Sequence, residues 1–217
     1  MQKTYIFDLD GTLVDSMAPA VEMVLSLLDE YGIEYESGIV KILTPLGFKG
    51  IAKYYAERLG VPLSPAEIYD IFTQRLTKMY AREIPLKRGV KALLERLKAA
   101  GAGLNVLTAS PHIFTDTCLK NNGIFHLFDN VWSSEDFGML KSNESIYVAV
   151  AEGLGVSVSD CVMVDDSYHV LCVAKSAGMK TVGVYEPFSE DVIEEIKRTA
   201  DLYLERFDGA WEWIENL

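Results

Sequence analysis

The sequence predicts the α/β fold class, with a parallel sheet covered by helices and an all-helical insertion. Short runs of apolar and β-branched residues alternate with helical patterns over most of the chain. These runs are apolar throughout, which is typical of strands that helices cover on both faces. Residues 16–84 contain only helical patterns, so they interrupt the alternation after the first strand. We therefore expect a Rossmann-like core formed by residues 1–15 and 85–217 and a helical cap domain formed by residues 16–84.

A strand and a group of helices come first along the chain. Thr4–Phe7 is short, apolar and rich in β-formers, which predicts a buried strand. From Ser16 onward, apolar residues recur at helical spacing, which predicts the first cap helix. Gly50–Leu59 predicts another helix. The stretch Ser64-Pro65-Ala66-Glu67 combines an N-cap, a proline at the first helical position and a capping-box glutamate, so a further helix should run to about Arg82.

Helices and strands alternate after Pro85. The expected strands are Leu104–Leu107, Val131–Trp132, Cys161–Val164, Thr181–Val184 and Leu202–Leu204. The expected helices are Gly89–Ala100, Thr115–Asn121, Ser142–Gly153, His169–Ala177 and Ser189–Thr199, before a C-terminal helix that contains Trp211 and Trp213.

The composition argues against several kinds of partner and location. The chain has 217 residues, 20 of them basic and 32 acidic, and its net charge of −12 disfavours nucleic acids and anionic membranes as partners. Cys118, Cys161 and Cys172 are odd in number and scattered, which indicates reduced core residues of a cytoplasmic protein. The N-terminus runs straight into the predicted strand and no apolar run is long enough to span a bilayer, so we expect neither a signal peptide nor a membrane segment.

Polar residues gather where the predicted strands end. Ligands of open α/β sheets bind beyond the carboxyl ends of the strands, so these residues predict the site. Acids this close would repel one another unless they shared a cation. Oxygen ligands without nearby cysteine or histidine favour a hard ion, and Mg²⁺ is the natural choice. The residues are Asp8 and Asp10 after the first strand, Thr108, Ala109 and Ser110 after the second, Asp165 and Asp166 after the Cys161–Val164 strand, and Lys141 before a helix.

Four segments, in order, resemble the four motifs of the haloacid dehalogenase-like (HAD) phosphohydrolases. They are "DLDGTLVDS", a threonine after the second main strand, a lysine before a helix, and "VMVDDS". The resemblance covers nearly the whole chain, including a small helical cap after the first motif. It implies an enzyme that transfers a phosphoryl group to one of its own aspartates.

The resemblance also implies roles for the acidic residues. Asp8 would be the nucleophile that forms an aspartyl-phosphate, and Asp10 would be the general acid and base. Mg²⁺ would be held by the Asp8 carboxylate, the backbone carbonyl of Asp10 and Asp166. Asp165 would be either a direct ligand or a partner through water.

Further roles concern the phosphoryl group and the substrate. Thr108 and the amide of Ala109 would hold phosphoryl oxygens, and Lys141 would neutralise their charge. Ser110 would either touch phosphate or cap the following helix. Lys49, which we expect in a cap loop, is a candidate for substrate specificity.

Smaller roles are expected in and after the first motif. Gly11 would allow a sharp turn beside the phosphate and Thr12 would brace it, whereas Asp15 and Ser16 would cap the first cap helix.

Asp10 argues against dehalogenase and phosphonate-cleaving relatives, which replace this residue. Sugar-phosphate mutases of the family carry a cap histidine where this sequence has Ala20. Two more departures are Val170, where many members have an additional acid, and Ser142, where a proline usually follows the lysine. The replacement of the histidine by Ala20 favours a phosphatase over a mutase. Without an acid at Val170, Asp165 and Asp166 would have to serve alone, and Ser142 leaves the shape of the lysine loop to be determined.

The function that we expect is a Mg²⁺-dependent phosphatase that hydrolyses a small phosphorylated metabolite, for example a phosphoglycolate-like compound or a sugar phosphate. The alternatives are a β-phosphoglucomutase-like mutase and a non-catalytic binding protein on the same fold. The retained Asp8, Asp10 and Lys141 argue against the latter. We expect a monomer or a homodimer.

Overall fold

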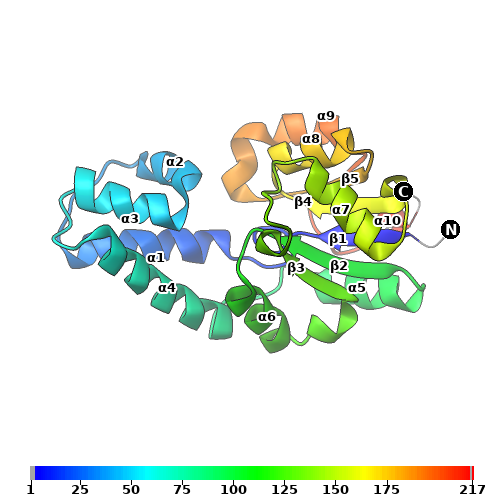
Figure 1. Ribbon diagram of the computed structural model, residues 1–217, viewed down its shortest axis with the longest axis horizontal. Coiled ribbons are helices and arrows are strands. Elements are labelled where there is room, and N and C mark those ends of the chain that lie inside the picture. The colour runs from blue at the N-terminus through cyan, green and yellow to red at the C-terminus, as the bar shows by residue number, and fades with distance from the viewer. Residues whose placement is uncertain (1–2, 216) are drawn as a thin grey trace. The chain divides into compact units, whose positions relative to one another are not determined.

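The computed structural model describes residues 3–215 and 217. Six parallel strands form one sheet in the order β3-β2-β1-β4-β5-β6 (Figure 1). The strands are β1 (Thr4–Phe7), β2 (Gly103–Thr108), β3 (Asn130–Ser133), β4 (Cys161–Asp165), β5 (Lys180–Val184) and β6 (Leu202–Leu204). The strand order reverses between β1 and β4, and this switch point is where open α/β sheets bind their ligands. The α/β fold class predicted from the sequence is confirmed.

Helices cover both faces of this sheet. They are α5 (Val90–Ala99), α6 (His112–Asn121), α7 (Ser145–Leu154), α8 (Tyr168–Ser176), α9 (Ile193–Thr199) and α10 (Trp211–Ile214). On one face, Ile6, Leu107 and Met163 pack with α7 and α8 in a buried apolar cluster. On the other face α5 packs against β2, and the hydroxyl of Tyr5 donates to the carbonyl of Ile214 in α10. The central strands β1, β2 and β4 are buried along almost their whole length, which explains why their sequences are mostly apolar on both faces.

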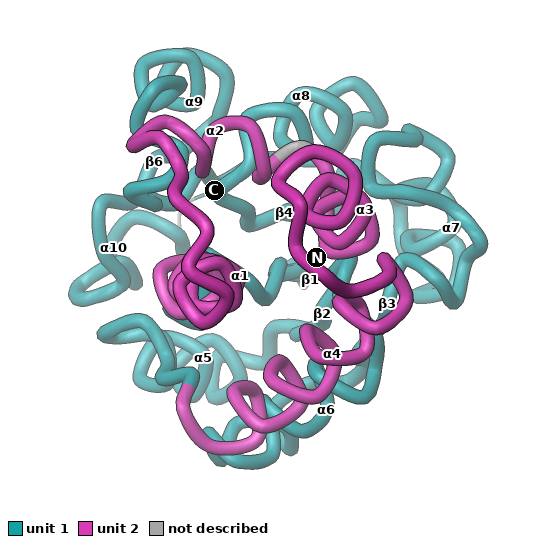
Figure 2. The backbone as a smooth tube through the Cα atoms, turned by 90° about the vertical axis from the view of Figure 1, so that its left-hand side faces the viewer, with its two compact units in different colours: residues 1–16, 84–217 teal, residues 17–83 magenta. Residues whose placement is uncertain are grey.

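The chain forms two compact units, residues 1–16 with 84–217 and residues 17–83 (Figure 2). The second unit consists of α1 (Met17–Glu30), α2 (Ile39–Leu43), a 3₁₀ turn (Thr44–Leu46), α3 (Gly47–Arg58) and α4 (Pro65–Arg82). Tyr55 and Phe72 are fully buried in it and meet edge to face. α4 starts with the predicted capping box, in which Ser64 and Glu67 hydrogen-bond reciprocally.

The two segments that connect the units pair with each other inside the first unit. Val14 and Leu86 form an antiparallel bridge. The amide of Asp15 donates to the carbonyl of Pro85, and the amide of Lys87 donates to the carbonyl of Leu13, each at 3.0 Å. The outgoing and returning chains therefore form a short two-stranded ribbon.

Two helix starts differ from the sequence prediction. α6 begins at His112 rather than Thr115, directly after Pro111, whose extended backbone precedes the helix. α7 begins at Ser145 rather than Ser142, because the residues after the lysine form a turn first. Both differences lie in loops that follow strands, where side-chain periodicity gives no signal.

Two other differences involve short or irregular helices. α9 begins at Ile193 because the preceding Pro187–Val192 forms a 3₁₀ helix. No pattern in the sequence indicates α2, because its five residues are too few for a helical period to stand out.

Among the described residues, no helix has the length and apolarity that crossing a membrane requires. The three cysteines are free thiols, with Cys118 and Cys161 buried and Cys172 partly exposed.

Candidate active site

The polar residues predicted at the strand ends lie on adjacent strands. Asp8 directly follows β1, Thr108 ends β2 and Asp165 ends β4, and all three side chains are buried. The amide of Asp8 donates to the carbonyl of Val164 in β4 at 2.9 Å, so the hydrogen-bond ladder continues up to the first acid. The central strand therefore holds Asp8 between the ends of its two neighbours.

A buried lysine connects two of these acids. The ammonium group of Lys141 donates to Oδ1 of Asp8 and to Oδ2 of Asp165, both at 2.6 Å. Only 8% of the lysine is exposed. Its backbone carbonyl accepts a hydrogen bond of 2.7 Å from the hydroxyl of Tyr147, which is fully buried in α7. The structure thus joins Lys141 to Asp8 across 133 residues of sequence, and it adds Tyr147, which the sequence did not indicate.

The turn that follows Asp8 and Asp10 contacts Asp166, the second acid of "VMVDDS". The hydroxyl of Thr12 donates to Oδ1 of Asp166 at 3.1 Å. Gly11 has a φ of +76°, and a Cβ at this position would lie 2.9 Å from Oδ2 of Asp166. Glycine is required here twice, for the left-handed backbone and for the space beside the carboxylate.

Two serine hydroxyls hold the Asp10 side chain. Ser16 donates to Oδ1 at 2.7 Å and Ser110 donates to Oδ2 at 2.6 Å. Ser110 was expected either to touch phosphate or to cap the following helix. Its side chain does not cap α6, because Pro111 is the residue that precedes this helix. The contact of Ser16 with Asp10 was not expected, because a serine before a helix indicates an N-cap.

The remaining phosphate-binding candidates follow β2. The hydroxyl of Thr108 accepts a hydrogen bond of 3.0 Å from the amide of Ser110, which folds the loop back on the strand end. Ala109 lies between them and is exposed. Their expected contact with a phosphoryl group stays a prediction.

Lys49 is not in a loop as expected. It lies in the first turn of α3, it is exposed, and its ammonium group is 5.6 Å from the ring centroid of Tyr69. Its proposed part in substrate specificity stays a prediction.

Burial and crowding of charge change the protonation of this cluster. Burial is the main reason why the pKa of Asp8 is well above the usual range, and the neighbouring acids raise it further against the opposing effect of Lys141. Burial and the nearby Asp165 raise the pKa of Asp166 to about 7. Burial alone would lower the pKa of Lys141, but the Asp165 and Asp8 carboxylates outweigh it and hold that pKa above its usual value.

The crowded acids fit a hard divalent cation. Asp8, Asp165 and Asp166 each offer a carboxylate oxygen, and these atoms lie within 4.8 Å of one another. An all-oxygen donor set at this spacing suits Mg²⁺. A cation held there would oppose the burial and the Asp165 charge that raise the pKa of Asp166.

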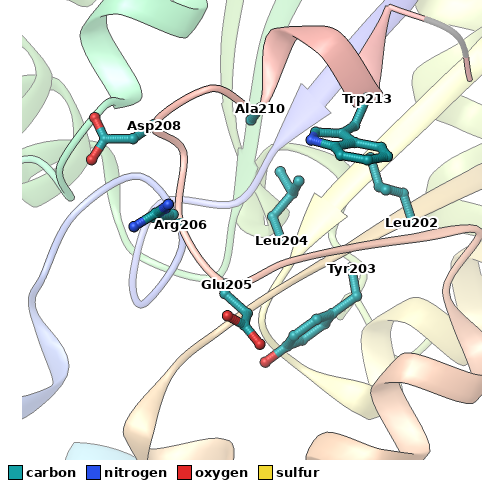
Figure 3. A pocket seen from close by; sticks show the side chains of 8 residues that line it. All are labelled: Leu202, Tyr203, Leu204, Glu205, Arg206, Asp208, Ala210 and Trp213. Atoms are coloured by element: carbon teal, nitrogen blue, oxygen red, sulfur yellow. The ribbon is translucent and has the colours of Figure 1, made fainter.

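A separate hollow of about 380 Å³ lies at the edge strand β6 (Figure 3). Apolar side chains of β6 and α10 line it together with charged side chains of the intervening loop. None of the predicted site residues is among its lining residues, which are Leu202, Tyr203, Leu204, Glu205, Arg206, Asp208, Ala210 and Trp213. The hollow is therefore distinct from the acidic cluster.

The sheet and its acidic edge define an α/β protein with a candidate active site beyond the carboxyl ends of its parallel strands. The family model described as haloacid dehalogenase-like hydrolase matches residues 5–184, and the chain belongs to this family.

Curated relatives match over most of the chain. The protein YhcW of Bacillus subtilis, provisionally named a phosphatase, is 29% identical over 184 residues, which is 84% of this chain and 83% of YhcW. The pyrophosphatase PpaX of Bacillus velezensis is 30% identical over 182 residues, which is 82% of this chain and 81% of PpaX.

Solved structures share the fold. A Thermotoga maritima protein provisionally named a β-phosphoglucomutase covers 100% of both chains with a TM-score of 0.84 and 21% identity. CbbY of Rhodobacter sphaeroides, in complex with phosphate, covers 97% of this chain and 96% of its own with a TM-score of 0.78 and 24% identity. YfnB of Bacillus subtilis, described as bound to magnesium, covers 100% of this chain and 99% of its own with a TM-score of 0.79 and 17% identity.

Proposed function

We propose that the protein is a phosphatase that hydrolyses a small phosphorylated metabolite by way of a phosphorylated Asp8. The observation that carries this proposal is the buried contact between Lys141 and Asp8 at the carboxyl edge of the sheet. A lysine in this place neutralises charge on a phosphoryl group that Asp8 attacks. The family membership and the relatives named as phosphatases support the same function.

In the first step, an oxygen of the Asp8 carboxylate attacks phosphorus and the bond from phosphorus to the leaving oxygen breaks. Asp10 donates a proton to that oxygen, so the product leaves as an alcohol. Lys141 holds the carboxylate, the hydroxyl of Thr108 and the amide of Ala109 bind the phosphoryl oxygens, and Ser110 holds Asp10.

In the second step, water attacks the phosphorus of the aspartyl-phosphate. Asp10, now a carboxylate, takes a proton from this water, and the bond between phosphorus and Asp8 breaks. The products are inorganic phosphate and the free Asp8 carboxylate, and Asp10 is again protonated for the next turnover.

The serine contacts fit both states of Asp10. With both of its oxygens accepting from Ser16 and Ser110, Asp10 has the hydrogen bonds of a carboxylate. A serine hydroxyl can also accept, so rotation of either hydroxyl would allow Asp10 to hold its proton without moving away.

Asp8, Asp165 and Asp166, with the backbone carbonyl of Asp10, would hold Mg²⁺. When bound, this ion supplies positive charge that reduces repulsion between the anionic nucleophile and the phosphoryl group. We assign residues 17–83 the role of a cap that selects the substrate.

The proposal is tested with Asp8→Asn and a panel of phosphorylated compounds. The panel includes p-nitrophenyl phosphate, phosphoglycolate, sugar phosphates and pyrophosphate, each with Mg²⁺. We expect the wild type to release inorganic phosphate from at least one small ester and Asp8→Asn to lose more than about 10³-fold in kcat while it stays folded. Wild-type activity in the variant would refute the role of Asp8.

A sugar-phosphate mutase is the second candidate, because the Thermotoga maritima structure shares this fold. Ala20 replaces the cap histidine of mutases and argues against it. With β-glucose 1-phosphate, a mutase forms the 6-phosphate, whereas the proposed phosphatase releases inorganic phosphate.

A further inference from the structure

An ion pair outside the acidic cluster is nearly as buried as the cluster itself. The ammonium group of Lys87 lies 2.7 Å from Oε2 of Glu186, and only 2% of the glutamate side chain is exposed. The same ammonium group donates to the carbonyl of Tyr185 at 2.7 Å. Neither charged residue belongs to the motifs of the sequence, and the proposed reaction does not use them.

Glu186 lies at the same edge of the sheet as the reacting groups. It is two residues beyond the end of β5, and β5 pairs with β4, which ends in Asp165. The other oxygen of Glu186 accepts a long hydrogen bond of 3.5 Å from the amide of Phe188, so the glutamate also starts the next 3₁₀ helix. Its position is therefore fixed by the sheet and by the following turn.

Lys87 belongs to the ribbon of connecting segments. Its amide donates to the carbonyl of Leu13, one residue before the bridge between Val14 and Leu86. The amides of residues 12–14 all donate to the carbonyl of Leu9, and the amide of Gly11 donates to the carbonyl of Val14. Continuous backbone hydrogen bonds thus connect Lys87 to the turn that contains Asp10 and Thr12.

We propose that Lys87 and Glu186 are positioning residues, whose ion pair fastens the connecting ribbon to the end of β5 and so fixes the turn that carries Asp10 and Thr12. This inference rests on the proposed phosphatase function for its kinetic consequence. Its structural part, that the ion pair holds the turn in place, does not depend on whether the protein is a phosphatase.

The energetics of buried ion pairs explain why a positioning role is the expected one. Desolvation cancels much of the attraction within such a pair, so replacement of both partners by apolar residues often leaves stability unchanged. The effect that we expect from such a pair is to fix the relative position of the two segments that it joins. Misplacement of a reacting group by about 1 Å costs about 10²-fold in rate, so a loosened turn should lower kcat.

The test compares Lys87→Met, Glu186→Leu and the double variant. Each single variant leaves one buried charge or its partner groups unpaired and should lose stability. The double variant should recover most of the stability measured by urea unfolding, yet its kcat should remain about tenfold or more below that of the wild type, with a smaller change in KM. A double variant that recovers kcat together with stability would show a purely structural pair and overturn the proposal.

Hydrogen exchange gives a result that does not depend on activity. We expect amides of residues 9–16 to exchange faster in the double variant than in the wild type, while α7 and β2 remain unchanged. Unchanged exchange in residues 9–16 would overturn the proposal even if kcat fell. If the wild type hydrolyses none of the phosphate panel, the proposed function fails, whereas the exchange result still decides whether the pair holds the turn.

Lys175→Met is the matched control. Lys175 also bonds one carboxylate and one backbone carbonyl, those of Asp201 and Thr199, at 2.8 and 2.7 Å. Lys175 lies in α8 and is not one of the proposed site residues. Its loss should leave kcat and the exchange of residues 9–16 unchanged, and a fall in kcat like that of the double variant would overturn the assignment to Lys87.

Discussion

The hydroxyl of Tyr147 donates a hydrogen bond of 2.7 Å to the backbone carbonyl of Lys141, the residue whose side chain touches both Asp8 and Asp165. The tyrosine is fully buried, so water cannot replace this hydrogen bond. The contact ties the loop before α7 to the helix itself. It therefore sets the point from which the lysine side chain reaches Asp8.

Tyr147→Phe should lower kcat/KM by about three- to tenfold, because the loop of Lys141 loses this restraint. The free energy of unfolding should fall by about 1 kcal/mol, the usual net value of one buried hydrogen bond. Steady-state kinetics and urea unfolding measure the two effects.

Tyr5→Phe is the control for this substitution. Tyr5 is also a buried tyrosine that donates to a backbone carbonyl, that of Ile214 at 3.1 Å. It should lose similar stability and keep wild-type kinetics. Equal kinetic losses in both variants would contradict a specific role for Tyr147.

Gly11→Ala should abolish most activity, because the new methyl group would push against the Asp166 carboxylate. We expect kcat to fall by about 10²-fold. The free energy of unfolding should fall by more than backbone strain alone would cause. Gly123→Ala isolates the strain, since Gly123 has a φ of +66° and nothing within 4 Å of its added Cβ. This control should lose about 1–2 kcal/mol and no activity. Equal effects of the two substitutions would disprove the proposed clash.

Asp166→Asn should stabilise the metal-free protein at high pH. The folded protein holds the Asp166 proton up to about pH 7, whereas an unfolded aspartate loses its proton near pH 4. Folding therefore takes up a proton between these values, and this group lowers stability as the pH rises through that window. The variant should gain on the order of 2–4 kcal/mol at pH 8, with a shallower pH dependence.

Urea unfolding in a chelator at pH 5 to 8 measures this effect. Some pH dependence should remain, because the pKa of Asp8 is also raised. Excess Mg²⁺ should stabilise the wild type and not Asp166→Asn. Identical pH dependence of the two proteins without metal would contradict the protonation of Asp166.

The double variant Ser16→Ala/Ser110→Ala lacks both hydroxyls that donate to Asp10. Its kcat should be about tenfold or more below that of the wild type, with a smaller effect on KM. Asp10 then keeps its carboxyl group and loses the contacts that orient it. Ser176→Ala removes a serine contact with the carboxylate of Glu144 and serves as the control with unchanged kinetics. A double variant with wild-type kcat would exclude a role for these serines.

Local signals explain what could be predicted from the sequence. Thr4–Phe7 and Leu202–Leu204 were predicted with their observed bounds, because short apolar runs between loops indicate buried strands. The start of α4 follows from Ser64 and Glu67, which are only three residues apart. Because parallel strands end at one edge, the predicted elements also brought the acids of β1 and β4 together.

Contacts between distant residues explain what was missed. Lys87 and Glu186 are 99 residues apart, and no periodicity or motif connects them. Ser16 carries the signal of a helix cap, and only the folded chain shows its hydroxyl on Asp10. Tyr147 has the spacing of an apolar core residue, so its hydroxyl gives no sign of the carbonyl that it meets.

The position of β1 inside the sheet, with β2 and β4 on either side, has a consequence for heat inactivation. A strand hydrogen-bonded on both edges does not fray on its own, because its release breaks two ladders at once. Asp8 continues one of these ladders through its amide. Asp8, the proposed nucleophile, should therefore stay in place until the whole core melts, and the temperature of half-inactivation should coincide with the midpoint of global unfolding.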